Sequence, residues 1–188
     1  MQMQNPDIAA AKIQTNEHYT AVAILLHWTI STCFLSALAL GIASNYLPES
    51  TMSTVFFLHK SFGLTVLFLM LIRIMWRLTH KPPAFPNTMP TWMKQSAKLS
   101  HFCLYLVALL MPLTGLLMSS AGNHFSSFWG LFAIKLPIQS KALGSFMNSA
   151  HYYIAWIIGG LVILHIGAVI KHQLIDKDRI LDRMTKLK

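Results

Sequence analysis

Four histidines stand at spacings that would let them bind metal at two separate depths of a helical bundle. His151 and His165 are 14 residues apart in the last apolar stretch of the chain. That interval is close to four whole helical turns, about 21 Å along one helix face. His27 lies near the start of the first apolar stretch and His59 near the start of the second. Because two histidines fill both axial positions of a haem iron, this spacing predicts two stacked haems, each held by two histidines.

The composition requires a membrane around these histidines. Of the 188 residues, 54% are hydrophobic and only 11% are charged, whereas about 25% of the residues of soluble domains are charged. Apolar windows of roughly 20 residues predict membrane-spanning helices. They occur at 21–43, 55–76, 99–120 and 148–170. The predicted fold class is all-α: an integral membrane four-helix bundle, up-and-down, with short connections.

The positive charges predict the orientation of this bundle. With four spans, 12 of the 15 lysines and arginines fall on the side of the chain termini and three fall on the other side. Both termini are therefore predicted to be cytoplasmic. The net charge of +9 follows from this bias and from contact with anionic lipid. No nucleic-acid motif is visible, and no nucleic-acid partner is expected.

Three parts of the chain are predicted. Residues 1–18 form a cytoplasmic N-terminal arm, residues 19–172 the four-span dihaem membrane domain, and residues 173–188 a charged cytoplasmic tail. A proline-rich linker is expected over residues 78–96 and a kink at Pro112. The apolar residues of the longest outer loop predict a short helix lying on the membrane surface. These residues are Phe125, Phe128, Trp129, Leu131 and Phe132.

Depth in the predicted spans decides how the histidines pair. At about 1.5 Å per residue, His27 and His165 each lie about 8–9 Å in from the cytoplasmic side. His59 and His151 lie only a few ångströms to about 6 Å in from the outer side. The predicted pairs are therefore His27 with His165 and His59 with His151. The second nitrogen of each ring should bond a carbonyl or a hydroxyl, with four candidate hydroxyls at these depths: Ser31, Thr54, Ser61 and Ser149.

The interval of 14 residues recurs in the other spans and marks further candidates. Gly41 follows His27 by 14 residues, Arg73 follows His59, and Gly115 follows His101. Gly41 and Gly115 would let a porphyrin approach the backbone closely. Arg73 would pair with a haem propionate.

Two more histidines are candidates for quinone contacts. His101 lies at the cytoplasmic end of the third span, where it could compete as a ligand or contact a propionate or a quinone. His172 lies at the membrane boundary, as an interfacial residue or a quinone contact. Three others are expected to be plain surface residues: His18, His80 and His124.

These segments together resemble the bacterial dihaem cytochrome b561 family over about residues 17–183. The matching stretches are Leu26-His27-Trp28, Leu58-His59-Lys60 with Arg73, Ser100-His101, Pro112-Leu113-Thr114-Gly115, Ala150-His151, Leu164-His165 and His172 with Asp176-Lys177-Asp178. The resemblance implies two haem b groups, with ligands pairing the first and fourth helices and the second and fourth helices. It also implies electron exchange with quinone. One branch resembles superoxide oxidases, and another supplies cytochrome b subunits to hydrogenases and other dehydrogenases.

The function that these features favour is electron transfer across the bacterial inner membrane, by a multi-pass protein, from superoxide at the outer face to ubiquinone. Bis-histidine ligation leaves no open iron position, so no separate catalytic residue is assigned. The few outer cations would attract the superoxide anion. They are Lys60, Lys135 and Lys141.

Two alternatives remain beside this function. The chain could be an electron-transfer subunit that docks a separate dehydrogenase or other redox protein through its outer loop. It could also bind or move a transition metal through the same histidines. Ligands for a single ion would lie within a few ångströms of one another, whereas these histidines are predicted at two levels about 21 Å apart.

Overall fold

The computed structural model describes residues 18–86 and 89–186, and it contains four long helices. They are α2 (Ala21–Ala43), α3 (Met52–Thr79), α4 (Thr91–Ala121) and α5 (Lys141–Lys171). All four are long and apolar enough to cross a membrane. They confirm the predicted four-helix membrane bundle. The predicted arm lies outside the described residues except for His18.

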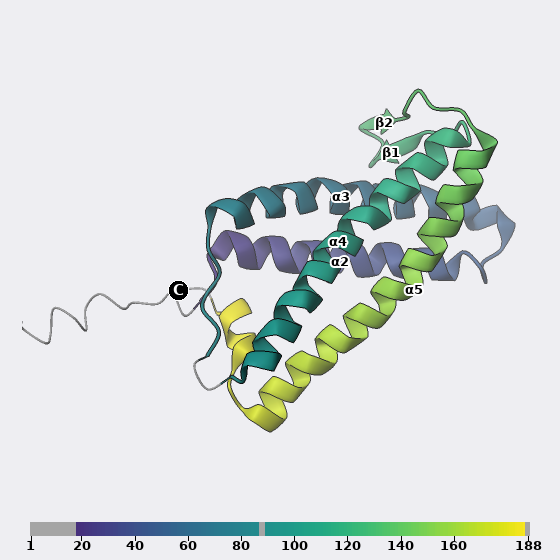
Figure 1. Ribbon diagram of the computed structural model, residues 1–188. Coiled ribbons are helices and arrows are strands. Elements are labelled where there is room, and N and C mark those ends of the chain that lie inside the picture. Colours follow the sequence, from purple (N-terminus) through teal and green to yellow (C-terminus); the bar gives the residue numbers. More distant parts are fainter. Residues whose placement is uncertain (1–17, 87–88, 187–188) are drawn as a thin grey trace, which may run out of the picture.

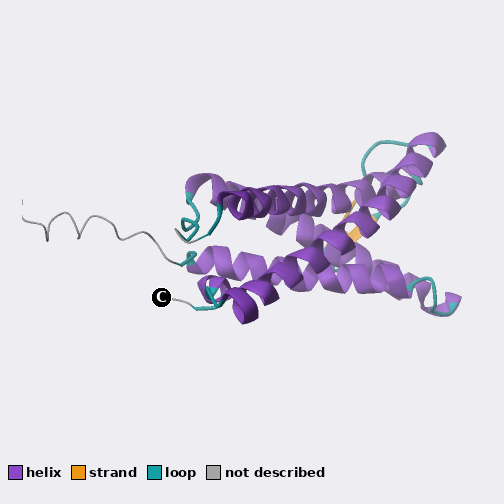
Figure 2. Ribbon diagram, turned by 60° about the horizontal axis from the view of Figure 1, so that its bottom comes forward, coloured by secondary structure: helices purple, strands orange, loops and turns teal. Residues whose placement is uncertain are grey.

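The helices run up and down, so that their ends gather at two opposite faces (Figure 1). One face holds the start of α2, the end of α3, the start of α4 and the end of α5; we call it the tail face. The other holds the opposite helix ends with a small hairpin; we call it the hairpin face. α2 lies along α3, α4 lies along α5, and α3 joins the two pairs by packing on α4. Figure 2 shows the two pairs crossing at an angle.

Local sequence signals set several helix ends. The Thr20 hydroxyl accepts a hydrogen bond from the Ala23 amide at 3.3 Å, and the Ser140 hydroxyl accepts one from the Leu143 amide at 3.3 Å. Both are N-cap contacts that satisfy otherwise unpaired first-turn amides. α4 begins directly after Pro90. Proline suits a helix start, because the backbone N–H that it lacks would have no partner there. The predicted linker over 78–96 is therefore wrong at residues 78–79, which belong to α3, and from residue 91 onward. Pro112 lies buried inside α4.

The buried core is formed mainly by three of the four helices. It contains Leu26, Ile30 and Phe34 of α2, Val66 and Met70 of α3, Val107 and Met111 of α4, and Ile158 of α5. Ile158 is the single buried residue of α5. α5 packs along α4 and adds partly buried side chains to this core, among them Ile154, Leu161 and Val162.

The outer loop does not form the predicted surface helix; it forms an antiparallel hairpin. Strand β1 (Ser126–Phe128) pairs with β2 (Phe132–Ile134) in the register Phe128 opposite Phe132. The turn places Trp129 and Gly130 at φ values of 52° and 76°, which a right-handed helix cannot contain. Contacts with α3 hold the hairpin. The Ser61 hydroxyl donates to the Ser127 carbonyl at 3.2 Å and accepts from the Trp129 amide at 3.2 Å.

The C-terminal residues fold back over the tail face. One π-helical turn, η2 (His172–Asp176), is followed by the 3₁₀ helix η3 (Ile180–Met184). The Trp28 indole donates to the Met184 carbonyl at 2.8 Å, and the Arg183 guanidinium donates to the Ala84 carbonyl at 2.7 Å. A hydrogen bond from Lys186 lowers the pKa of the Asp182 carboxyl in η3. The tail therefore ties the first span to the connection that follows α3.

Candidate functional site

The structure brings the four candidate ligands together as the two predicted pairs. The ring centres of His27 and His165 lie 6.4 Å apart, and those of His59 and His151 lie 6.0 Å apart. An imidazole nitrogen lies about 2.0–2.1 Å from a first-row metal and about 1.1 Å from its own ring centre. Two imidazoles on opposite sides of one metal therefore have ring centres about 6.3 Å apart. Both pairs match this separation.

The pairs lie near opposite faces of the bundle. His27 is about two turns from the start of α2, and His165 about two turns from the end of α5, so both lie toward the tail face. His59 and His151 lie in the first third of α3 and α5, toward the hairpin face. We call the first pair, His27 and His165, the tail pair. We call the second, His59 and His151, the hairpin pair.

Both rings of the hairpin pair are anchored through Nδ1. Nδ1 of His59 lies 2.8 Å from the Ala37 carbonyl, and Nδ1 of His151 lies 3.0 Å from the Met111 carbonyl. Because a carbonyl only accepts, each Nδ1 must carry the proton. Nε2 is then left unprotonated for a metal. The Thr114 hydroxyl lies 3.1 Å from Nδ1 of His151.

The carbonyl partners were predicted by type but not by position. Of the four candidate hydroxyls, none is hydrogen-bonded to a histidine in the described part of the chain, and Ser61 instead holds the hairpin. The sequence interpretation also missed Thr114. One indication of this contact was present in the sequence: Thr114 carries a hydroxyl, precedes Gly115, and lies at the predicted depth of His151.

Gly41 and Gly115 lie directly against the hairpin pair. A Cβ atom at Gly41 would lie 3.2 Å from Cε1 of His59, and one at Gly115 would lie 3.1 Å from Cε1 of His151. Both separations are tighter than ordinary carbon contacts. Each glycine therefore makes room for an imidazole ring, and the close approach of a porphyrin remains a prediction.

The tail pair has a different, cationic neighbourhood. The Arg73 Nε donates to the Tyr105 hydroxyl at 2.7 Å, and its Nη1 donates to the Ala23 carbonyl at 3.4 Å. A third histidine, His101, has its ring centre 5.7 Å from that of His165. Ala23 is one helical turn from His27 and Tyr105 one turn from His101, so Arg73 lies near both histidines. Its predicted contact with a propionate is compatible with this position.

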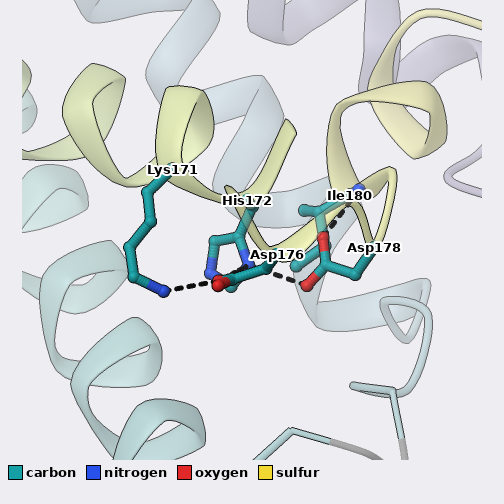
Figure 3. A network of polar contacts seen from close by, with 5 residues as sticks. All are labelled: Lys171, His172, Asp176, Asp178 and Ile180. Atoms are coloured by element: carbon teal, nitrogen blue, oxygen red, sulfur yellow. Dashed lines mark hydrogen bonds and ion pairs between the residues drawn. The ribbon is translucent and has the colours of Figure 1, made fainter. Parts of the chain in front are cut away.

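His172 belongs to an ion-pair network at the end of α5 (Figure 3). Its Nδ1 lies 2.7 Å from Asp178 and 3.2 Å from Asp176. Lys171 pairs with the same Asp176 oxygen at 2.5 Å. These contacts hold the turn that leads into the tail. A role for His172 toward a quinone stays a prediction.

The three lysines predicted to attract superoxide differ in solvent exposure and in hydrogen bonding. The Lys60 ammonium is half-buried and donates to the Ser119 hydroxyl at 2.9 Å and to the Phe125 carbonyl at 3.1 Å. Lys135 bonds the Asn123 side chain and lies over the Phe125 ring. Lys141 is exposed at the first residue of α5. Lys60 and Lys135 therefore anchor the loop, and Lys141 is the most accessible of the three cations.

The donor set fits haem better than a bare metal ion. Each level contains a pair of imidazoles at the separation that a single iron between them requires. On α5 the two levels are separated by an almost wholly apolar stretch, which offers few polar groups to an ion.

Comparison with known proteins gives the same assignment. The prokaryotic cytochrome b561 family matches residues 18–186. Cytochrome b561 homolog 2 of Escherichia coli is 28% identical over 90% of this chain and 92% of its own length. Cytochrome b561 homolog 1 of the same organism is 25% identical over 88% of this chain and 96% of its own. A probable superoxide oxidase CybB of Yersinia pestis is 25% identical over 90% of this chain and 96% of its own.

The family match covers all four membrane helices and every candidate histidine from His18 onward. It agrees with the predicted resemblance and with the paired imidazoles of the bundle. Members of this family bind haem b and carry electrons in bacterial membranes. This chain belongs to the prokaryotic cytochrome b561 family and is a multi-pass bacterial membrane protein of electron transfer.

Proposed function

We propose that this protein holds two haem b groups and transfers electrons across the inner membrane from superoxide at the hairpin face to ubiquinone at the tail face. The observation that carries the proposal is the presence of two histidine pairs, at 6.0 and 6.4 Å, near opposite ends of one bundle. In the proposed orientation both termini and the tail face are cytoplasmic, in line with the excess of lysine and arginine there.

The histidines determine what kind of chemistry is possible. A bound haem supplies a one-electron carrier, and histidines on both sides of its iron leave no position for oxygen to bind. Each superoxide anion gives up one electron and leaves as dioxygen. Two such electrons and two protons convert ubiquinone to ubiquinol. The balance requires no further oxidant or reductant.

Residues at each face have proposed roles in this reaction. Arg73 would pair with a propionate of the haem at the tail pair. His101, adjacent to His165, is proposed to contact the quinone, with His172 as a second candidate. At the hairpin face, the exposed Lys141 would contribute most to the attraction of superoxide, and Lys60 and Lys135 less. The relative named as a probable superoxide oxidase supports this substrate.

Absorption spectroscopy of the detergent-purified protein tests the first half of the proposal. We expect two b-type haems per chain and sharp low-spin bands after reduction with dithionite. Ubiquinone reduction driven by a superoxide-generating system tests the second half. A protein that binds two haems but reduces no ubiquinone with superoxide would disprove the substrate and keep the cofactors.

The hairpin favours a second candidate function, the docking of a separate redox protein. Phe125, Leu131 and Phe132 are 62%, 77% and 48% exposed at the hairpin face. An apolar patch of this kind fits a protein partner or the membrane surface. Replacing Leu131 and Phe132 by serine would abolish electron delivery from a partner protein but leave delivery from superoxide intact. Full superoxide activity of the isolated monomer would count against this candidate.

A further inference from the structure

A small pocket opens at the tail face beside the end of α3. Its walls come from the residues before and at the start of α2, the last two turns of α3, the residues that follow α3, and Tyr105 of α4. Its volume is about 30 Å³, which suits a group of a few atoms, since one water needs about 10–15 Å³ on such a measure.

The lining of this pocket is basic. Arg73, Arg77, Lys81, His18 and His80 all line it, and none of the described lining residues is acidic. Arg77 and Lys81 have no carboxylate partner among the described residues. Uncompensated cations around a small cavity favour an anion.

Two histidines line the same cavity, and Nδ1 of His80 already bonds the Thr79 hydroxyl at 2.8 Å. Nδ1 of His18 is shielded from solvent and has no hydrogen-bond partner in the described part of the chain. A buried polar atom without a partner indicates a group that the site is built to meet. The His80 ring stacks on the Trp76 ring at 3.8 Å with an interplanar angle of 4°. Trp76 is fixed in turn by its indole, which donates to the Thr20 hydroxyl at 3.0 Å.

The position of the pocket identifies the source of the anion. α2 begins at Ala21 and α3 ends at Thr79, so the pocket lies where two spans leave the apolar layer. Tryptophan and tyrosine are enriched at this depth, and basic pockets there bind lipid head groups. We infer that this pocket binds the phosphate of an anionic phospholipid through Arg77, Lys81 and His18.

This site is separate from the proposed haem contacts. Arg73 forms its deep wall and is already bonded to Tyr105 and the Ala23 carbonyl. Arg77 is one turn farther toward the face, and Lys81 lies beyond the helix end. The lipid phosphate therefore contacts the outer cations, and Arg73 is left to the tail pair.

Native mass spectrometry of the haem-loaded protein tests the inference by titration with phosphatidylglycerol and, separately, with phosphatidylethanolamine. We expect one phosphatidylglycerol per chain to bind at least about tenfold more tightly than phosphatidylethanolamine. The double variant Arg77→Gln/Lys81→Gln should lose this preference. The matched control Lys94→Gln/Lys98→Gln removes the same charge from the same face, outside the pocket, and should keep it.

Four results would overturn the inference. Equal binding of the two lipids by the unmodified protein would show that no selective site exists, whether or not the variants fold. Equal losses in both double variants would show general attraction to the tail face. Loss of one haem in Arg77→Gln/Lys81→Gln with unchanged lipid preference would assign the pocket to a propionate. Displacement of the lipid by micromolar inorganic phosphate would make free phosphate the ligand.

Discussion

The two histidine pairs have the same separation but are held by different surroundings. In the hairpin pair, each ring donates to a backbone carbonyl and faces a glycine. In the tail pair, neither ring has a hydrogen bond to a described residue, and Arg73 and His101 lie nearby. The hairpin pair is thus fixed by backbone carbonyls, whereas the tail pair lies beside the guanidinium of Arg73.

This contrast gives the two sites different expected reduction potentials. Donation from Nδ1 to a carbonyl makes an imidazole a stronger donor to iron, which favours the oxidised state. A nearby guanidinium charge disfavours the more positive, oxidised state. We therefore expect the haem of the tail pair to have the higher potential. With this order of potentials, electron transfer from the hairpin face to the tail face would be thermodynamically favourable.

The largest expected effect comes from removing one ligand of each pair. His59→Ala should leave one haem per chain and lower superoxide-driven quinone reduction at least about 100-fold. His27→Ala should keep most of the second haem with an altered spectrum, because His101 is 5.7 Å from His165 and can take the vacant position. Haem content measured after purification distinguishes the two variants.

The double variant His27→Ala/His101→Ala completes this test. It should lose the haem of the tail pair entirely. If His27→Ala alone loses that haem as completely as His59→Ala loses its own, His101 does not replace His27 as a ligand. The two pairs would then not differ in how they tolerate the loss of one histidine.

Filling the space opposite the hairpin pair should have the next largest effect. Gly41→Ala or Gly115→Ala places a methyl group about 3 Å from a ligand ring, which costs about 1–3 kcal/mol of stability. We expect the melting temperature of the haem-loaded protein to fall by about 5 °C. Gly159→Ala on α5, where no atom lies within 4 Å of the new methyl group, is the matched control. A decrease of the same size in this control would point to general helix effects.

Removing the charge beside the tail pair should shift one potential only. Arg73→Gln is expected to lower the potential of the tail-pair haem by about 60 mV, a tenfold change in a one-electron equilibrium. The reduction potential of the hairpin-pair haem should remain unchanged within experimental error. Lys94→Gln, a charge loss on the same face, serves as the control in the spectroelectrochemical titration. Equal shifts of both haems would show that Arg73 acts through the whole bundle.

The smallest expected effect concerns the outer cations. Lys141→Gln should lower the rate with superoxide about two- to threefold and weaken its dependence on salt, because this cation is exposed. Lys60→Gln should instead lower the stability, since Lys60 bonds the Ser119 hydroxyl and the Phe125 carbonyl. Rates over a range of ionic strengths test both variants. An unchanged salt dependence in Lys141→Gln would contradict steering by this residue.

The spans and histidine pairs were predictable because bilayer thickness imposes them. Apolar windows located all four helices, and residue depth within each window paired His27 with His165 and His59 with His151. The helix starts were less predictable. α4 and α5 begin at Thr91 and Lys141, seven or eight residues before the predicted spans, because hydropathy detects the apolar layer and not the polar turns that extend from it.

The hairpin and the histidine anchors depend on contacts between distant residues. Aromatic spacing over residues 125–132 suits a surface helix locally, but Ser61 of α3 fixes Ser127 and Trp129 in a turn. Thr114 and the Met111 carbonyl meet His151 from a neighbouring helix. Such pairings depend on how α3, α4 and α5 are rotated, which periodicity alone does not specify.

α5 contributes a histidine to each pair and is the last span to leave the ribosome. While α2, α3 and α4 are already in the bilayer, His27 and His59 have no partners from α5, and neither iron position is complete. If both pairs hold haem as proposed, loading at both levels must follow insertion of α5. A chain truncated before residue 151 would carry three intact spans and no bis-histidine site.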